Sequence, residues 1–272
     1  MGGGCDSFGG QDPLAVSEYA IVLLSGWGVR SCVWDAVRPT FERYARVFRL
    51  DLGELASCAA AQGRSITLDV LVDLLAEATP ERAVWIGWSL GGMVAARFAV
   101  RWPERVAALV TVATNPCFTA RETWRQAMPE AEFLDFSRRF ERDVEGALQR
   151  FLTLQCSGSE TARVDARALK ACVSPCDGDT LKWLQDGLRI LRDADLREDY
   201  QRIDVPSMHL LGENDALVPA GVAEDILRLQ PGARVRVMQG LSHVPFVSAP
   251  RVFAGLVEEF LGGCYAGRSS RA

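Results

Sequence analysis

Runs of consecutive apolar residues alternate, along the first 115 residues, with segments whose apolar positions recur every three or four residues. A short apolar run predicts a buried strand, and the longer spacing predicts a helix with one buried face. Strands are predicted at 18–25, 46–52, 83–88 and 105–114, and helices at 33–45, 65–78 and 90–102. This alternation is typical of a parallel sheet with helices on both faces.

Single residues are expected to set or disturb the ends of these helices. Thr67 is a candidate N-cap for the helix at 65–78, because its hydroxyl can accept a hydrogen bond from a free backbone N–H of the first turn. Pro103 ends the helix at 90–102, since a helix cannot easily continue into a proline. Pro39 falls in the middle of the helix predicted at 33–45.

Residues 116–200 lose the alternation. No strand is predicted there, and four segments have helical spacing. Strands are predicted again at 205–212 and 233–240, followed by a helix at 250–263 with Gly262 near its C-cap. We therefore expect a flexible leader (1–17), an α/β core (18–115 and 201–272) and an inserted helical lid (116–200).

Composition narrows the class of protein. The chain of 272 residues is 49% hydrophobic and 24% charged, as expected of a globular protein, and its net charge of −5 disfavours nucleic-acid binding. No apolar run approaches a membrane span, and the N-terminal segment lacks the apolar stretch of a secretory signal. We expect a cytoplasmic monomer with reduced thiols and no membrane contact.

The cysteines and histidines argue against a metal site. The eight cysteines include no C-x-x-C pair, and there are only two histidines, so the spacing typical of zinc ligands is absent from the sequence. Neither a metal nor an organic cofactor is expected.

The strongest chemical motif is Gly87-Trp88-Ser89-Leu90-Gly91, where a predicted strand meets a predicted helix. A G-x-S-x-G turn in that position is the nucleophile elbow, in which small neighbours allow a strained serine to project from the sheet. The alternative is a glycine-rich turn that holds a serine by chance. The position favours Ser89 as a nucleophile.

A serine needs a base, and the chain offers two histidines. His209 lies within the apolar run SMHLLG and is expected to be a buried strand residue. His243 lies in GLSHVPF, a loop after the last predicted strand, where a side chain can reach the carboxyl edge of the sheet. His243 is therefore predicted to be the base.

The third member is predicted to be Asp215, which follows the strand at 205–212 through a turn at Gly212. Its carboxylate would hold the imidazole tautomer and stabilise the imidazolium. Glu213 is a nearby competitor, and an Asn-Asp turn is the structural alternative. The order serine, aspartate, histidine is the order of α/β hydrolases, which predicts an α/β-hydrolase fold.

Backbone N–H groups are expected to stabilise the oxyanion. Leu90 follows the serine at the start of a helix, and Trp27 lies in Ser25-Gly26-Trp27-Gly28 directly after the first strand. Both N–H groups can face the developing charge, because glycines let the backbone approach the ester. A plain glycine-rich loop is the alternative at Trp27.

The helical lid is expected to form an apolar slot over the serine, and its lining also has an ordinary explanation as lid core. Its candidate residues are Phe118, Trp124, Phe151 and Leu154. The lid also carries basic clusters, for which a solvated helix face is the simpler explanation. These are Arg138, Arg139 and Arg142, and Arg163 with Arg167.

Further motifs resemble those of a known family. They are GWG (26–28), GWSLGG (87–92), PCFTARETW (116–124), RFLTLQCSGSETARVDARALK (150–170) and SHVPF (242–246). The chain resembles the BioH family of pimeloyl-[acyl-carrier protein] methyl ester carboxylesterases over nearly all of residues 19–260. The elbow alone would indicate only an α/β hydrolase, whereas the lid motifs are more specific.

The resemblance implies a serine carboxylesterase that removes the methyl group from pimeloyl-acyl-carrier protein methyl ester in biotin synthesis. It places the family's triad on Ser89, Asp215 and His243, which agrees with the assignment above. It places oxyanion and substrate contacts on Trp27, Leu90 and Phe151.

The resemblance also implies that arginines on the lid dock the acyl-carrier protein. They match Arg150, Arg163 and Arg167 here, while a further basic position is Gly146. Ser25 stands where relatives usually have histidine, which leaves backbone donors intact but changes the hydrogen bonds around the loop.

Two other functions remain open from sequence. A broad-specificity short-chain carboxylesterase would use the same triad and differ only in the lid. A non-catalytic acyl-binding protein of the same fold would typically lack a triad member, whereas all three candidates are present here.

Overall fold

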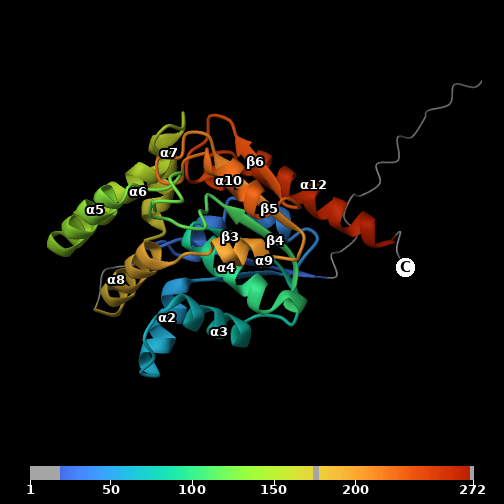
Figure 1. Ribbon diagram of the computed structural model, residues 1–272, viewed down its shortest axis with the longest axis horizontal. Coiled ribbons are helices and arrows are strands. Elements are labelled where there is room, and N and C mark those ends of the chain that lie inside the picture. Colours follow the sequence, from blue (N-terminus) through green and yellow to red (C-terminus); the bar gives the residue numbers. More distant parts are fainter. Residues whose placement is uncertain (1–18, 174–177, 270–272) are drawn as a thin grey trace, which may run out of the picture.

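The computed structural model describes residues 19–173 and 178–269, so the expected leader lies outside the described residues. Six parallel strands form one sheet in the order β2-β1-β3-β4-β5-β6 (Figure 1). They are β1 (Ala20–Leu24), β2 (Val47–Leu50), β3 (Ala83–Trp88), β4 (Val106–Val112), β5 (Ser207–Gly212) and β6 (Arg234–Met238). All six predicted strands are thus confirmed, with small shifts at their ends.

Burial explains why central and edge strands have different patterns of apolar residues. Every residue of β3, β4 and β5 is buried, so these strands appear as unbroken apolar runs. β2 and β6 lie at the edges, and β6 alternates exposed and partly buried residues up to a buried Met238. The carboxyl ends of all strands meet along one edge of the sheet, where a ligand can reach several loops at once.

Helices connect and cover the strands. They are η1 (Ser31–Trp34), α1 (Arg38–Phe41), α2 (Leu52–Ala61), α3 (Leu68–Ala78), α4 (Leu90–Arg101), η2 (Pro103–Arg105), α5 (Glu130–Arg142), α6 (Val144–Cys156), α7 (Ala162–Ala171), α8 (Gly178–Asp193), α9 (Arg197–Arg202), α10 (Val222–Leu229), α11 (Pro245–Ser248) and α12 (Pro250–Ser269). The Thr67 cap is confirmed, because its hydroxyl accepts a hydrogen bond from Val70 N at 3.2 Å.

Two helix predictions are wrong. The continuous helix at 33–45 is replaced by the short turns η1 and α1, and Pro39 stands at the beginning of α1, where its missing N–H costs no hydrogen bond. Gly262 is not at a C-cap, since α12 continues through it to Ser269. The predictions also missed α2, α9, α10 and α11.

The span 116–200 holds α5, α6, α7 and α8, and its described residues contain no strand beyond isolated bridges at Thr119–Met128 and Arg121–Trp124. The helices α5 and α6 pack on each other, as do α6 and α7, and the three lie together at one side of the molecule (Figure 1). Helix α9 crosses the end of this span at residue 200 and packs instead against α4 and α10.

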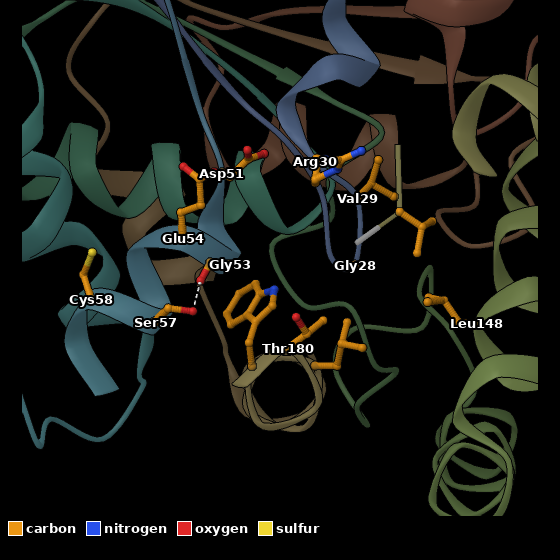
Figure 2. A pocket seen from close by; sticks show the side chains of 13 residues that line it. Gly28, Val29, Arg30, Asp51, Gly53, Glu54, Ser57, Cys58, Leu148 and Thr180 are labelled. Carbon is orange, nitrogen blue, oxygen red and sulfur yellow. Dashed lines mark hydrogen bonds between the residues drawn. The ribbon is translucent and has the colours of Figure 1, made fainter. Parts of the chain in front are cut away.

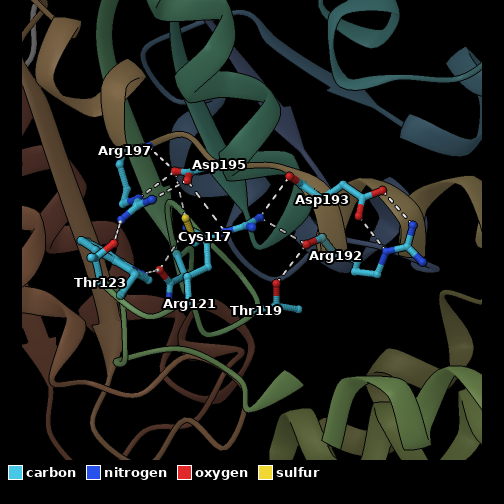
Figure 3. A network of polar contacts seen from close by, with 10 residues as sticks. Cys117, Thr119, Arg121, Thr123, Arg192, Asp193, Asp195 and Arg197 are labelled. Atoms are coloured by element: carbon cyan, nitrogen blue, oxygen red, sulfur yellow. Dashed lines mark hydrogen bonds and ion pairs between the residues drawn. The ribbon is translucent and has the colours of Figure 1, made fainter. Parts of the chain in front are cut away.

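A polar network joins the two points where the chain enters and leaves this helical region (Figure 3). The Asp195 carboxylate accepts hydrogen bonds from the Cys117 thiol at 3.0 Å and from the Arg197 guanidinium at 2.6 Å. Nearby, the Thr119 hydroxyl donates to the Arg192 carbonyl at 2.9 Å. Burial beside this carboxylate raises the pKa of Cys117 to about 11, so the thiol stays protonated and remains a donor.

Within the described residues, no helix is long and apolar enough to cross a membrane.

Candidate active site

Ser89 occupies a strained turn between β3 and α4. Its backbone angles are φ 56° and ψ −122°, a conformation that side-chain-bearing residues rarely adopt. A Cβ on Gly87 would come within 2.4 Å of the Gly91 carbonyl oxygen, and one on Gly91 would come within 2.5 Å of the Ser25 carbonyl oxygen. Only glycine fits at both places, as the elbow interpretation requires.

His243 and Asp215 form a buried pair. His243 Nδ1 lies 2.7 Å from Asp215 Oδ2, while Asp215 Oδ1 accepts hydrogen bonds from the N–H groups of Leu217 and Val218 at 2.8 and 2.9 Å. The pair is well shielded, since His243 is 1% exposed. Because the carboxylate accepts, it selects the tautomer with the proton on Nδ1 and leaves Nε2 able to accept a proton.

The backbone of His243 is fixed from two sides. Its N–H donates to the Gln155 carbonyl of α6 at 3.1 Å, and its carbonyl accepts from Trp88 Nε1 at 2.8 Å. Trp88 directly precedes Ser89, so this bond ties the histidine loop to the elbow. His243 Nε2 is buried without a hydrogen-bond partner among the described residues, Ser89 included. In unliganded sites such contacts often tighten only when substrate binds.

The two candidate oxyanion donors lie beside Ser89. Leu90 is the first residue of α4, where no preceding helical turn can accept its N–H. The loop that holds Trp27 follows β1, whose Leu24 pairs with Gly87 of β3. A Cβ on Gly26 would lie 3.3 Å from Ser89 Cβ, so this loop runs against the serine.

Of the predicted slot residues, Phe151 contacts the oxyanion loop. Its ring packs edge-on against Trp27 with centroids 5.1 Å apart. Phe118 and Trp124 are buried, and Trp124 Nε1 donates to Asn115 Oδ1 at 2.8 Å. Leu154 is 41% exposed and does not belong to an enclosed slot in this structure.

The competing candidates have other partners. His209 is fully buried in β5, with Nδ1 2.7 Å from Thr111 Oγ1 and Nε2 3.0 Å from Gln230 Oε1, which confirms its assignment as a buried strand residue. Burial lowers the pKa of His209 to about 4, so the ring is neutral. Glu213 accepts a hydrogen bond from Gly240 N at 2.8 Å rather than one from a histidine.

The arginines of the helical region differ in their pairing. Arg150 on α6 lies 3.4 Å from the Asp143 carboxylate, whose other oxygen caps α6 through the N–H of Gly146. Arg163 and Arg167 are exposed on α7, one turn apart, and neither forms an ion pair among the described residues. The two α7 guanidinium groups are therefore available to an external anion.

A cavity of about 370 Å³ opens beside the Trp27 loop (Figure 2). Its walls come from that loop, from the start of α2 and from the helical region, and they do not include Ser89, Asp215 or His243. They are Gly28, Val29, Arg30, Asp51, Gly53, Glu54, Ser57, Cys58, Leu148, Val173, Thr180, Trp183 and Leu184. No local pattern in the sequence predicts this cavity, because its walls come from distant segments. No cluster of potential metal ligands occurs within the described parts of the chain.

Comparison of the structure with solved structures shows its fold. It matches a bromoperoxidase from Bacillus anthracis with a TM-score of 0.74 at 18% identity, covering 91% of this chain and 93% of that one. It matches an esterase from Exiguobacterium antarcticum with a TM-score of 0.72 at 17% identity, covering 90% and 92% of the two chains. These likenesses confirm the fold and carry no information about substrate.

Sequence comparison is more specific. The profile described as "Alpha/beta hydrolase family" matches residues 21–256. The chain is 40% identical over 234 residues to the pimeloyl-[acyl-carrier protein] methyl ester esterase of Salmonella newport, covering 86% of this chain and 90% of that protein. It is 38% identical over 241 residues to the protein of the same name from Yersinia enterocolitica, covering 88% and 92%. The chain therefore belongs to the alpha/beta hydrolase family and, within it, to the family of the pimeloyl-[acyl-carrier protein] methyl ester esterases.

Proposed function

We propose that this protein is a serine carboxylesterase that hydrolyses the methyl ester of pimeloyl-acyl-carrier protein in biotin synthesis. The products are pimeloyl-acyl-carrier protein and methanol. The names of its relatives supply the substrate. The observation that carries the chemistry is the 2.7 Å contact between His243 Nδ1 and Asp215, at the same edge of the sheet as the strained Ser89.

In the first half-reaction, Ser89 Oγ attacks the ester carbonyl while His243 Nε2 takes the hydroxyl proton. The carbonyl oxygen becomes an oxyanion, which the N–H groups of Trp27 and Leu90 stabilise. Collapse of the tetrahedral intermediate breaks the bond to the methoxy oxygen. His243 returns its proton to that oxygen, methanol leaves, and the acyl group stays on Ser89.

In the second half-reaction, water replaces methanol. His243 removes a proton from the water as its oxygen attacks the acyl-enzyme, and the same N–H groups stabilise the second oxyanion. The proton then passes to Ser89 Oγ, which restores the free serine and releases the acid. Asp215 keeps the ring oriented throughout, and the scheme requires neither a metal nor an organic cofactor.

The span 116–200 acts as a lid in this proposal, and α6 presents Phe151 to the substrate. Arg150, Arg163 and Arg167 dock the carrier protein, because exposed guanidinium groups attract an anionic partner surface. Neither Arg163 nor Arg167 forms an ion pair with another described residue, which supports this role, since no described carboxylate has to be displaced first. We assign the enzyme to the cytoplasm as a monomer without nucleic-acid or membrane partners. Its negative net charge disfavours nucleic acid, and Cys58, Cys117 and Cys156 form no disulfide within the described residues, as expected in a reducing compartment.

The test is kcat/KM on methyl pimeloyl-carrier protein, measured beside a small free methyl ester, with Ser89→Ala as the inactive control. A strong preference for the carrier substrate supports the proposal. Equal or better activity on the small ester would reduce it to a broad-specificity carboxylesterase. Absence of turnover, with no covalent labelling of Ser89 by an organophosphate, would favour the non-catalytic acyl-binding protein.

Docking is tested by reversing charge on α7. The double variant Arg163→Glu, Arg167→Glu is expected to lower kcat/KM for the carrier substrate at least tenfold and to leave the small ester within about twofold, because only the carrier meets that face. Arg251→Glu is the matched control, since Arg251 is exposed on α12 and has no ion pair among the described residues. Equal loss on both substrates would show that the α7 arginines support the lid instead.

A further inference from the structure

Trp27 belongs to a loop of the α/β core, but its side chain is enclosed by lid helices. Its indole Nε1 donates to the Leu184 carbonyl of α8 at 2.8 Å. Its ring packs against Phe136 and Phe140 of α5 at centroid distances of 6.0 and 5.6 Å, and against Phe151 of α6 at 5.1 Å. Three lid helices therefore hold one core residue.

Gly187 of α8 makes room for this indole. A Cβ at Gly187 would lie 2.4 Å from Trp27 Cδ1 and 2.9 Å from its Nε1, closer than real Cβ contacts come. Glycine in a helix interior weakens the helix, so its presence needs a compensating reason. The close approach of the Trp27 ring supplies that reason, and Leu184, one turn earlier, supplies the hydrogen-bond acceptor.

The loop around Trp27 has little freedom to absorb a shift of the ring. On one side, a Cβ at Gly26 would lie 3.0 Å from the Trp88 ring of the elbow. On the other side, a Cβ at Gly28 would lie 3.2 and 3.3 Å from Leu148 and Leu184 of the lid. The loop is thus confined between the elbow and the lid, and a displaced indole has to move its own backbone.

We infer that helix α8 of the lid positions the oxyanion donor, with Gly187 and the Leu184 carbonyl as positioning residues that act through the Trp27 side chain. This inference rests on the proposed function, in which the Trp27 N–H stabilises the oxyanion. It adds that this N–H is correctly placed only while the lid holds the indole. The helical lid then contributes to the chemical step as well as to substrate recognition.

The first test is Gly187→Ala, assayed on a small methyl ester so that carrier docking plays no part. Loss of one oxyanion donor typically costs a factor of about 10² to 10³ in kcat, so misplacement is expected to cost at least tenfold. KM is expected to stay within about twofold, because the donor acts in the transition state. The matched control is Gly255→Ala, a glycine of α12 with open space around its Cα, which is expected to keep wild-type kinetics.

A second variant separates this effect from a general disturbance of the lid. Trp27→Ala removes the ring that the new methyl group would strike, so adding Gly187→Ala to it is expected to cause no further loss of kcat. If the two losses multiply instead, Gly187 does not act through Trp27 and the inference is overturned. Turnover remains measurable in both backgrounds, since the serine, its base and the Leu90 donor are kept.

An inhibitor gives a readout that a merely structural role would not move. A trifluoromethyl ketone adds to Ser89 and presents an oxyanion, so its affinity is expected to fall in Gly187→Ala in parallel with kcat/KM. End-point labelling with an organophosphate counts the competent sites and corrects for unfolded protein. Unchanged affinity per competent site would overturn the inference. An inactive wild-type enzyme would instead overturn the proposed function, so the two failures are distinguishable.

Discussion

Asp215→Asn is a nearly isosteric change whose result the geometry determines. One side-chain oxygen accepts two backbone N–H groups, from Leu217 and Val218, and the other faces His243 Nδ1. The side-chain amide of an asparagine at this position could adopt two orientations, but only one of them satisfies the surrounding hydrogen bonds. Its NH2 group cannot face two N–H donors, so its oxygen stays with the backbone and its NH2 group faces the ring.

This orientation reverses the histidine tautomer. Nδ1 must now accept a hydrogen bond, so the proton moves to Nε2, and Nε2 can no longer remove the Ser89 proton. The same reversal in serine-protease triads lowers kcat about 10⁴-fold, or roughly 5 kcal/mol of transition-state stabilisation. The loss is expected in kcat with little change in KM. The fold should survive, because both backbone hydrogen bonds are kept.

The assay is steady-state hydrolysis of a small methyl ester, with thermal unfolding as the check on folding. Glu213→Gln is the matched control, because Glu213 accepts a hydrogen bond from Gly240 N and would be the acid under the competing assignment. Asp215→Asn with kcat within tenfold of wild type would refute the tautomer argument. A large loss in Glu213→Gln alone would transfer the role to that residue.

Two further perturbations test the scaffold. His209 has a folded pKa of about 4, below its ordinary value of 6.5, so the unfolded state binds the extra proton between these pH values. The free energy of unfolding is therefore expected to fall as pH drops through this window, by about 1.4 kcal/mol per pH unit for this group. Urea titrations at a series of pH values measure this free energy, and its dependence on pH should be weaker in His209→Gln than in the wild type. Gly87→Ala would place a methyl group 2.4 Å from the Gly91 carbonyl oxygen, so soluble protein is expected to lose nearly all esterase activity. Wild-type kinetics in that variant would contradict the strained elbow.

The sequence was most informative where a local rule decides the structure. Strands β3, β4 and β5 are buried on both faces and therefore appear as apolar runs. The elbow shows in the sequence because steric crowding around Ser89 leaves only glycine at Gly87 and Gly91. The Thr67 cap depends on a contact three residues away. In each case a short run of neighbouring residues carries the signal, even where the crowding atom is distant in sequence, as Ser25 is from Gly91.

The features that the sequence analysis did not predict depend mainly on contacts between residues distant in sequence. Helix α2 carries Gly53, a poor helix former, and a Cβ there would lie 3.1 Å from Trp183 of α8, so the close approach of a distant segment favours glycine at this position. The Trp27–Leu184 hydrogen bond joins residues 157 positions apart, so no local pattern reveals it. The helix expected at 33–45 failed because periodic apolar residues can also be buried by two short turns around Pro39.

The two histidines show how structure adds a chemical criterion to a positional one. Sequence separates them by place, since His209 lies inside a strand and His243 follows one. In the structure both rings are buried, so exposure does not distinguish them.

The hydrogen-bond partners of the two rings distinguish them. Both nitrogens of His209 are engaged, by Thr111 and Gln230, and neither partner carries a charge that could stabilise an imidazolium. His243 has a carboxylate on Nδ1, and its Nε2 has no hydrogen-bond partner in the described parts of the chain. A general base needs one free nitrogen and a group that stabilises the positive charge it acquires. Only His243 meets both conditions, so the His209→Gln variant used for the pH titrations is also expected to retain esterase activity.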